Sequence, residues 1–529
     1  MKLIKDLKFG FRDAENYRSN EFKDLFNKIF VRTDDLDKLL KSTTYFLIGE
    51  KGTGKTAYAM FLNNNDYKNT LSSINYIRET DYQKFLVLKK EKHLTLSDYT
   101  SIWKVILYVL ISKTIIQIES DSIFSKFSMS LKAINYAIDE YYNSAFSPEI
   151  VYALNFVEKS KHAAELIAKY LKVNLGSESS TSFSENHFQT NLLYIKRKFE
   201  DGLKSVKLKK NHILFIDGID IRPQNIPYVD YLDCVKGLTN AVWEVNNDFF
   251  SSIKDSSGRM KVVLLIRPDI FSTLGLQNLN NKYRDNSVLL DWRTTYPHFR
   301  SSLLFEMIDR LLESQQDEKY SLGECWDYYF PYKIYYRRKD KLEDNSFIGF
   351  LRYSLFRPRD IIAMLEILQT NFKRDKIDEH DVFNYANFTD HDFLSKYSEY
   401  KLGEIKDHLA FYYSESDYEV FLKFFEFLKG NYSFNYDNYL SAYKNLIKYI
   451  ETNKILLPVF CDSAEKFLQF MYETNVICYI EKSQDEKYFR WCFRERDYST
   501  ISPKVKTGLT YNIHYSLFKA LNVGQNLLE

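Results

Sequence analysis

The sequence predicts an α/β core, in which helices cover both faces of a parallel sheet, followed by a helical lid and a small α+β domain. Three observations lead to this fold class. A glycine-rich loop at residues 49–56 stands between a short apolar run and a glycine-free, helix-compatible stretch. Two later apolar runs, 213–217 and 261–268, have the length of buried strands. Glycine and proline are scarce, with 16 and 9 in 529 residues, which favours long helices and a predominantly helical chain overall.

The length of the chain predicts several domains, because 529 residues exceed what one hydrophobic core holds together. We expect an N-terminal segment at 1–44 that packs on the core, and a core at 45–300 with a long helical insertion at about 118–205. A helical lid at 301–400 and a C-terminal helical and winged-helix domain at 401–529 follow. Within the insertion, the serine-rich stretch 176–182 has the composition of a flexible loop.

Composition favours a cytoplasmic protein. The formal net charge is only +2, so no global basic field indicates nucleic acid. The N-terminus has no apolar signal core. The most apolar segment, 105–111, is too short to span a bilayer and is expected to be a buried helix, so we expect no membrane partner. No two cysteines form a C-x-x-C pair, which indicates reduced thiols rather than a zinc site; they are Cys234, Cys325, Cys461, Cys478 and Cys492.

The loop at 49–56 matches the P-loop pattern G-x-x-x-x-G-K-[ST] in full. In such loops backbone N–H groups point at phosphate oxygens, and the helix N-terminus adds favourable partial charge. Lys55 is expected to reach the β- and γ-phosphates of ATP, and the Thr56 hydroxyl to bind Mg²⁺. The strand-like residues 45–48 and the helical residues 56–62 argue against a chance glycine-rich turn. The expected nucleotide-binding residues are Gly49, Gly52, Thr53, Gly54, Lys55, Thr56 and Ala57.

The run 213–217 ends in Asp217, which is the Walker B pattern. A buried parallel strand delivers such a carboxylate at its C-terminal edge, where Asp217 can hold Mg²⁺ together with Thr56. Many ATPases place a glutamate directly after this aspartate to orient the attacking water, but this chain has Gly218. Either Asp220 polarises the water, or hydrolysis is slow and the protein is a nucleotide switch. Asp220 as a turn or N-cap residue is the alternative.

Several arginines are candidates for sensing the nucleotide. Arg267 ends the strand at 261–268 and is expected to reach the γ-phosphate, with a surface arginine in an Arg-Pro turn as the alternative. Arg284 stands where an arginine finger is often found, but a solvated loop arginine is the favoured interpretation. Pro358 begins a helix whose N-terminus directs Arg357 or Arg359 toward the nucleotide, and Arg359 is assigned to nucleotide binding.

The C-terminal part predicts helices at 405–428 and 435–452, a helix at 464–472, and strands at 476–480 and 488–493. A helix followed by such a hairpin is typical of a winged-helix domain. The basic and aromatic stretch 335–341 is interpreted as a solvated loop rather than a nucleic-acid patch.

In order and spacing these motifs resemble the STAND and KAP branch of AAA+-related P-loop ATPases, and most closely the FunZ-like bacterial P-loop ATPases. The resemblance includes Gly10-Phe11-Arg12-Asp13-Ala14, the Asp217-Gly218-x-Asp220 element, and residues 513–521, which read Ile-His-x-x-Leu-x-x-Ala-Leu. It implies ATP binding and hydrolysis, and a place in bacterial antiphage defence with an effector encoded nearby. The sequence shows no appended nuclease or protease motif, so the effector is expected to be a separate protein.

The function expected from the sequence is a regulatory ATPase that couples its nucleotide state to an effector or a nucleic-acid partner. Its expected catalytic residues are Lys55, Asp217, Asp220 and Arg267, its metal ligands Thr56 and Asp217, and its cofactors ATP and Mg²⁺. The alternative is a winged-helix regulator that binds DNA or RNA and uses ATP mainly as a structural ligand. The sequence leaves the oligomeric state open, with a homo-oligomer as one option.

Overall fold

The computed structural model describes residues 1–77, 96–119, 129–143, 185–222, 226–274, 284–335, 343–374, 382–483 and 486–524. The chain divides into two compact units. Unit 1 comprises Met1–Arg32, Glu50–Gly54 and Leu290–Glu529, and unit 2 comprises Thr33–Gly49 and Lys55–Leu289. The predicted loop at 176–182 and most of the basic stretch 335–341 lie outside the described residues.

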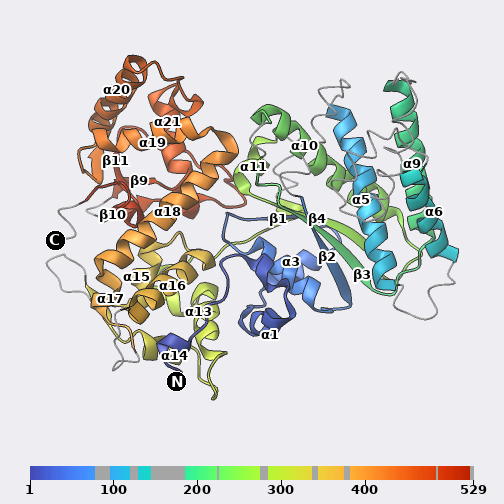
Figure 1. The fold of residues 1–529 in the computed structure, drawn as a ribbon, viewed down its shortest axis with the longest axis horizontal. Coiled ribbons are helices and arrows are strands. Elements are labelled where there is room, and N and C mark those ends of the chain that lie inside the picture. The colour runs from blue at the N-terminus through green and yellow to red at the C-terminus, as the bar shows by residue number, and fades with distance from the viewer. Residues whose placement is uncertain are drawn as a thin grey trace, which may run out of the picture. The chain divides into compact units, whose positions relative to one another are not determined.

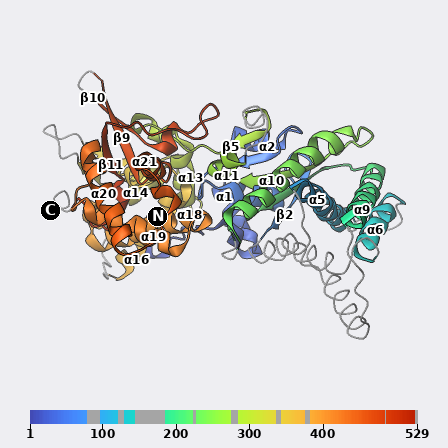
Figure 2. The same cartoon turned by 90° about the horizontal axis from the view of Figure 1, so that it is seen from above.

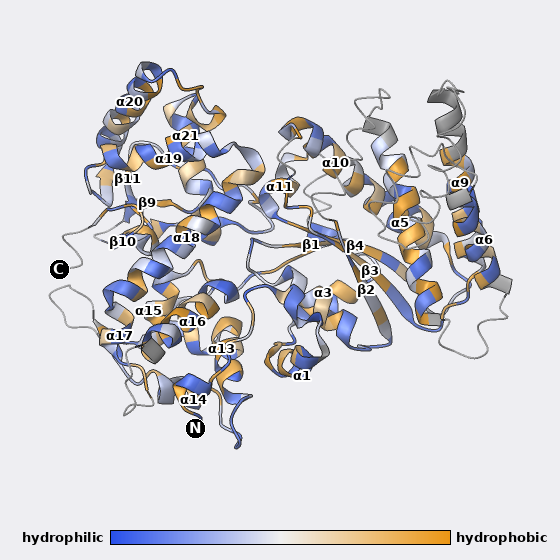
Figure 3. Ribbon diagram, viewed as in Figure 1, coloured by the Kyte–Doolittle hydropathy of each residue, from blue (hydrophilic) through white to orange (hydrophobic). Residues whose placement is uncertain are grey.

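Unit 2 is built on a five-stranded parallel sheet with the strand order β2-β3-β4-β1-β5. Strands β1, β2, β3 and β4 are labelled in Figure 1. The central strands are hydrophobic along most of their length (Figure 3), as expected of strands buried on both faces. Because parallel strands end at one common edge, Gly49, Asp217 and Arg267 follow or end their strands along the same edge. The predicted parallel sheet is therefore confirmed. Its strands are β1 (Phe46–Ile48), β2 (Thr70–Tyr76), β3 (Asn211–Asp217), β4 (Met260–Ile266) and β5 (Ser287–Leu289).

Seven of the described helices of unit 2 pack on this sheet or on one another. Helix α3 contacts β2, α10 contacts β4, and α5 lies between α10 and α9. Helices α5, α6 and α9 lie side by side in both views (Figures 1 and 2). Their bounds are α2 (Asp34–Leu40), α3 (Lys55–Asn64), α5 (Leu96–Glu119), α6 (Met129–Asn143), α9 (Glu185–Ser205), α10 (Tyr228–Glu244) and α11 (Pro268–Thr273).

The apolar segment 105–111 is part of the long helix α5. Within α5, residues Tyr99–Ile118 are long and apolar enough to cross a membrane by length and composition alone. The prediction that this segment is too short to span a bilayer was therefore wrong, because the apolar run continues in both directions along the helix. The predicted burial is confirmed, since Val105 and Leu107 are fully buried and α5 packs against α10. This is the packing of a core helix.

A buried lysine ties α2 to the sheet of unit 2. Lys261 of β4 is 5% exposed, and its ammonium donates hydrogen bonds to the carbonyls of Leu39 (2.6 Å) and Lys41 (2.8 Å). These carbonyls belong to the end of α2, where a cation also interacts favourably with the helix dipole. We predict that Lys261→Met lowers the free energy of unfolding by about 1–3 kcal/mol, because two buried acceptors lose their donor. Urea unfolding measures this, with the exposed Lys207→Met as control; equal stability of the two variants would contradict it.

Unit 1 contains many helices and a separate antiparallel sheet. That sheet has four strands in the order β10-β9-β11-β8. Its strands are β8 (Ser433–Asn435), β9 (Ile477–Ser483), β10 (Glu486–Arg490) and β11 (Thr510–Ile513). A small hairpin is formed by β6 (Lys333–Tyr335) and β7 (Glu343–Asn345). The α-helices are α1 (Asn20–Ile29), α13 (Leu303–Glu313), α14 (Glu324–Tyr329), α15 (Ser346–Tyr353), α16 (Pro358–Arg374), α17 (Tyr385–Thr389), α18 (His391–Tyr412), α19 (Glu415–Phe427), α20 (Tyr436–Thr452), α21 (Ala464–Glu473) and α22 (Cys492–Glu495).

Two predicted elements of the C-terminal part have different bounds. The helix expected at 405–428 is two helices, because Tyr413 is extended and Ser414 caps α19 in a capping box with Asp417. The strand expected at 488–493 ends at Arg490, and the next residues form α22. The expected order of α21 followed by an antiparallel hairpin is present, but β11 separates β9 from β8. The winged-helix assignment therefore stays a prediction.

The N-terminal residues are divided between the units. The sequence predicted that 1–44 form one segment on the core, whereas Met1–Arg32 belong to unit 1 and Thr33 begins unit 2. The amide of Gln369 in α16 donates hydrogen bonds to the carbonyls of Ile4 and Leu7, both at 2.7 Å. These long-range bonds hold the first residues in unit 1. The four-part division of the chain stays a prediction.

Candidate nucleotide-binding site

The P-loop connects β1 to α3. Gly52 and Gly54 have φ angles of +86° and +92°, a left-handed conformation that glycine adopts without strain. Between them, Thr53 closes a turn, since its backbone N–H and its hydroxyl both donate to the carbonyl of Glu50, at 3.2 and 2.9 Å. The glycines of the motif therefore stand where the backbone needs them. Ala57, also expected at the nucleotide, lies in the first turn of α3.

Lys55 and Thr56 begin α3 within unit 2. The Lys55 side chain is 9% exposed, and its Nζ donates a hydrogen bond to the carbonyl oxygen of Gly49 at 2.9 Å. The Thr56 hydroxyl donates to Oδ2 of Asp217 at 2.6 Å. The structure thus brings together the hydroxyl and the carboxylate that the sequence assigned to one metal ion, although they are 161 residues apart.

The ionised form of Asp217 is disfavoured as long as no cation lies beside it. Burial raises its pKa, the nearby charge of Asp220 raises it further, and Thr56 and Lys55 oppose the shift, so that the pKa is about 6. A divalent cation beside Asp217 would relieve this penalty. No group of three or more His, Cys, Asp or Glu side chains suited to a metal occurs among the described residues. The site therefore fits Mg²⁺ held by one or two protein ligands, with phosphate oxygens and water completing the shell.

Gly218 explains why no glutamate follows Asp217. Its φ angle is +89°, and a Cβ built on it would lie 2.4 Å from the carbonyl oxygen of Ile77. The backbone of Ile77, directly after β2, thus fills the space that any side chain would need. We predict that Gly218→Ala destabilises the protein by at least about 1–3 kcal/mol, from backbone strain and the clash. Thermal unfolding measures this against Gly403→Ala, where a Cβ meets nothing within 4 Å; an equal melting temperature in the two variants would contradict it.

Three further residues of unit 2 are candidates, from the sequence, for a role at the nucleotide. Asp220 lies half-buried in the turn after β3, where its charge acts on Asp217. Arg267 is 2% exposed and pairs with Asp269 through two hydrogen bonds, at 3.1 and 2.5 Å, so it is not a surface arginine. Its strand, β4, lies between β3 and β1. Arg284 is exposed. The roles of Asp220, Arg267 and Arg284 toward a nucleotide stay predictions.

The apex of the P-loop, Glu50–Gly54, belongs to unit 1, where both arginines at the start of α16 contact it. The Arg357 guanidinium donates a hydrogen bond to the carbonyl of Lys51 at 2.7 Å. The backbone N–H of Arg359 points at the carbonyl of Gly52 (3.5 Å), and a Cβ built on Gly52 would lie 3.0 Å from the Cβ of Arg359. The Arg359 Nε donates to the carbonyl of Arg12 at 3.0 Å. These two arginines therefore contact the backbone of the loop, and nucleotide contact by Arg359 stays a prediction.

Sequence reasoning missed three further contacts of the loop apex. The indole N–H of Trp292 donates to the carbonyl of Thr53 at 2.8 Å. The Arg496 guanidinium pairs with the Glu50 carboxylate, and Lys51 pairs with Asp407 at 2.8 Å. The charged run 494–497 directly after the aromatic stretch 488–493 is an unusual feature that could have drawn attention to Arg496. Nothing in the local pattern identifies its partner.

His514, which belongs to the C-terminal stretch 513–521, has a structural role in unit 1. Its Nδ1 lies 2.7 Å from the Ser516 hydroxyl and accepts a hydrogen bond from the backbone N–H of Ser516 at 3.3 Å. The His514 side chain thereby caps the short 3₁₀ turn at Tyr515–Leu517. Burial, together with the charge of Lys401, lowers its pKa to about 3, so the ring is neutral at physiological pH.

Comparison with known proteins gives little further information. No protein-family model matches the sequence, and no curated protein matches it either. Among solved structures, the chain is similar to the structure of the Aeropyrum pernix Orc1 protein in complex with DNA, with a TM-score of 0.35 and 10% sequence identity, over 95% of this chain and 92% of that one. A likeness at this level establishes neither a shared fold nor a shared function. Assignment of the site therefore rests on the residues themselves.

Proposed function

We propose that the protein binds ATP together with Mg²⁺ at the P-loop and hydrolyses it slowly. One observation carries the proposal. Thr56, the last residue of a complete P-loop, donates a 2.6 Å hydrogen bond to Asp217, and these two residues are the metal ligands expected from two distant motifs. The left-handed glycines and the buried Lys55 support it.

Each residue of the site has a separate role in phosphoryl transfer. Lys55 neutralises charge on the β- and γ-phosphates, and the Thr56 hydroxyl and the Asp217 carboxylate hold the metal. When bound, Mg²⁺ would supply further charge neutralisation between the phosphates. Asp220 orients the attacking water, since Gly218 leaves no side chain at the position that usually carries a glutamate. Because Asp220 stands two positions further along the chain, slow turnover is expected.

Phosphate release by the full chain, with ATP and Mg²⁺, tests the proposal. We expect slow, Mg²⁺-dependent turnover that falls at least about 10-fold in Asp220→Asn, because a positioned general base contributes 10²–10⁴-fold. The exposed Asp255→Asn serves as the control. Unchanged turnover in Asp220→Asn would remove that residue from the mechanism, and the absence of any turnover would leave ATP as a ligand of a switch.

The resemblance to FunZ-like ATPases supports a finer proposal. In it, the protein is a regulatory ATPase related to the AAA+ class, its nucleotide state controls a separate effector protein, and the pair acts in antiphage defence in the cytoplasm. Light scattering with and without ATP tests whether a homo-oligomer forms. An ATP-dependent oligomer would allow Arg284, which is exposed, to act on a neighbouring copy.

A nucleic-acid partner is the second candidate, supported by the helix α21 and the β9–β10 hairpin of the proposed winged helix. Lys482 and Lys487 are exposed on this hairpin. However, Arg490 and Lys506 both pair with Glu481, which neutralises part of the basic surface. Binding to labelled DNA and RNA over a salt series separates the candidates, because phosphate contacts give strongly salt-dependent affinity.

A further inference from the structure

Glu50 and Lys51, which follow the first glycine of the P-loop, form ion pairs with side chains of α18 and with Arg496. Both residues occupy positions that the P-loop pattern leaves unspecified. In unit 1, Glu50 pairs with Arg496, and the ammonium of Lys51 lies 2.8 Å from Asp407 and 3.6 Å from Glu404. Charged side chains at unspecified positions of a phosphate-binding loop are usually free to point into solvent. In this protein, both Glu50 and Lys51 form ion pairs instead.

Arg496 is suited to fix a backbone position. It is 7% exposed and follows α22, and its Nε donates a hydrogen bond to the carbonyl of Ile501 at 2.8 Å. Burial of an arginine is costly unless its charge is paired. The Glu50 carboxylate supplies that pairing from within the P-loop. A displacement of Glu50 would therefore leave a buried guanidinium without its counter-charge.

Lys51 is held from two directions. Its ammonium contacts Glu404 and Asp407 of α18, and its carbonyl accepts from Arg357. Arg357 is in turn paired with Asp360 at 2.8 Å, and Lys401 of α18 donates to the same carboxylate at 3.2 Å. Burial alone would raise the pKa of Asp360, but the charges of Arg357 and Lys401 hold it well below its usual value, so the cluster stays ionised.

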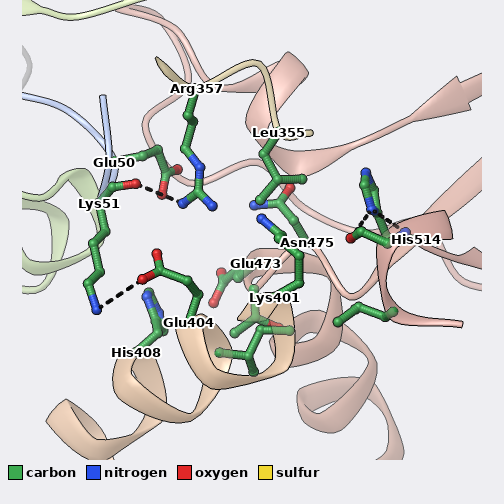
Figure 4. Close-up of a pocket in the computed structure, with 14 residues that line it drawn as sticks. Glu50, Lys51, Leu355, Arg357, Lys401, Glu404, His408, Glu473, Asn475 and His514 are labelled. Atoms are coloured by element: carbon green, nitrogen blue, oxygen red, sulfur yellow. Dashed lines mark hydrogen bonds and ion pairs between the residues drawn. The ribbon is translucent and has the colours of Figure 1, made fainter. Parts of the chain in front are cut away.

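A polar cavity of about 40 Å³ adjoins these contacts. Figure 4 shows Glu50, Lys51, Arg357, Lys401 and Glu404 around it. Its volume has room for about two or three water molecules. Within the described residues, Oε2 of Glu404 is buried and has no hydrogen-bond partner. The cavity therefore lies directly beside the charged side chains that contact the loop.

We propose that Arg496, Glu404 and Asp407 are positioning residues, which set the affinity for the nucleotide by holding Glu50 and Lys51. This deepens the proposed function and rests on it. Phosphate binding needs the loop in one curvature, and contacts that fix this curvature beforehand reduce the cost of binding. By reciprocity, a bound nucleotide stabilises the same contacts, so the segments around α18 and Arg496 respond to occupancy of the P-loop.

Equilibrium titration of ATP with Mg²⁺ tests the proposal in a double-mutant cycle. We expect Arg496→Gln and Glu50→Gln each to raise the dissociation constant for ATP at least about 5-fold. The double variant should bind ATP no more weakly than the weaker-binding of the two single variants. The matched control is Arg490→Gln, because Arg490 forms ion pairs with Glu481 and Glu495, away from the P-loop. Its affinity should equal that of the wild type. Unchanged affinity in Arg496→Gln, or additive losses in the double variant, would overturn the proposal.

Two further measurements keep the outcome clear. If Arg496→Gln does not fold, Asp407→Asn replaces it, because Asp407 is 65% exposed and its loss does not endanger the fold. Hydrogen exchange of the wild type should slow at 401–412 and 492–501 when ATP is added, a response that a merely structural arginine would not give. No change in exchange at these segments would overturn the proposal. Failure of the wild type and of Arg490→Gln to bind ATP would instead count against the proposed function.

Discussion

Asp217→Asn is expected to stabilise the nucleotide-free protein while abolishing turnover of ATP. Asparagine keeps the shape of the side chain and still accepts the hydrogen bond from Thr56, but it removes a buried charge beside Asp220. Because the folded pKa of Asp217 is about 6 against an ordinary 3.8, its ionised form opposes folding by about 3 kcal/mol at neutral pH. The variant should gain roughly that free energy of unfolding and lose Mg²⁺-dependent ATP hydrolysis.

The sign of the pH dependence follows from the raised pKa. Above pH 6 the folded wild type carries the full penalty, and it gains stability as the pH falls from 6 toward 4, where Asp217 takes up a proton in the folded state first. Chemical denaturation at pH 4.5 and pH 8 measures this. The difference between Asp217→Asn and the wild type should be large at pH 8 and small at pH 4.5. The exposed Asp37→Asn is the control, and a variant that is less stable than the wild type at pH 8 would contradict this prediction.

Lys55→Ala is expected to abolish ATP binding and leave the fold intact. The ammonium is the positive charge that the P-loop aims at the β- and γ-phosphates. Lys51, the other lysine of the loop, is paired with Asp407. In the absence of nucleotide the change removes only the hydrogen bond to Gly49, which is worth about 0.5–1.5 kcal/mol.

The comparison for Lys55→Ala is Lys68→Ala, which removes an exposed lysine of unit 2 that pairs with Asp37. Circular dichroism and thermal unfolding should show both variants folded. Phosphate release should be lost in Lys55→Ala only. ATPase activity equal to that of Lys68→Ala would show that the chemistry does not occur at the P-loop.

The core of the site was predictable because its signals are local. Strand, glycine loop and helix N-terminus occupy about twenty consecutive residues, and Asp217 ends an apolar run that is recognisable by itself. Parallel strands share one edge, so the meeting of Thr56 with Asp217 follows from the order of motifs alone. The same reasoning predicted the alternation of strands and helices in unit 2.

What the sequence could not predict depends on contacts between distant segments. Glu50 and Arg496 have no pattern in common, and the ion pair of Lys51 with Asp407 joins residues 356 positions apart. Gly218 is required by the backbone of Ile77, which no local pattern reveals. The break between α18 and α19 was missed because the apolar spacing continues across Tyr413, whereas the capping box at Ser414 decides the boundary.

The most direct test of the central claim is an equilibrium titration of the full chain with ATP in Mg²⁺ and again in EDTA. Lys55 and the Thr56–Asp217 pair predict saturable, one-to-one binding that weakens without the metal and disappears in Lys55→Ala. Equal affinity in Lys55→Ala, or no binding by the folded wild type at millimolar ATP with Mg²⁺, would contradict it.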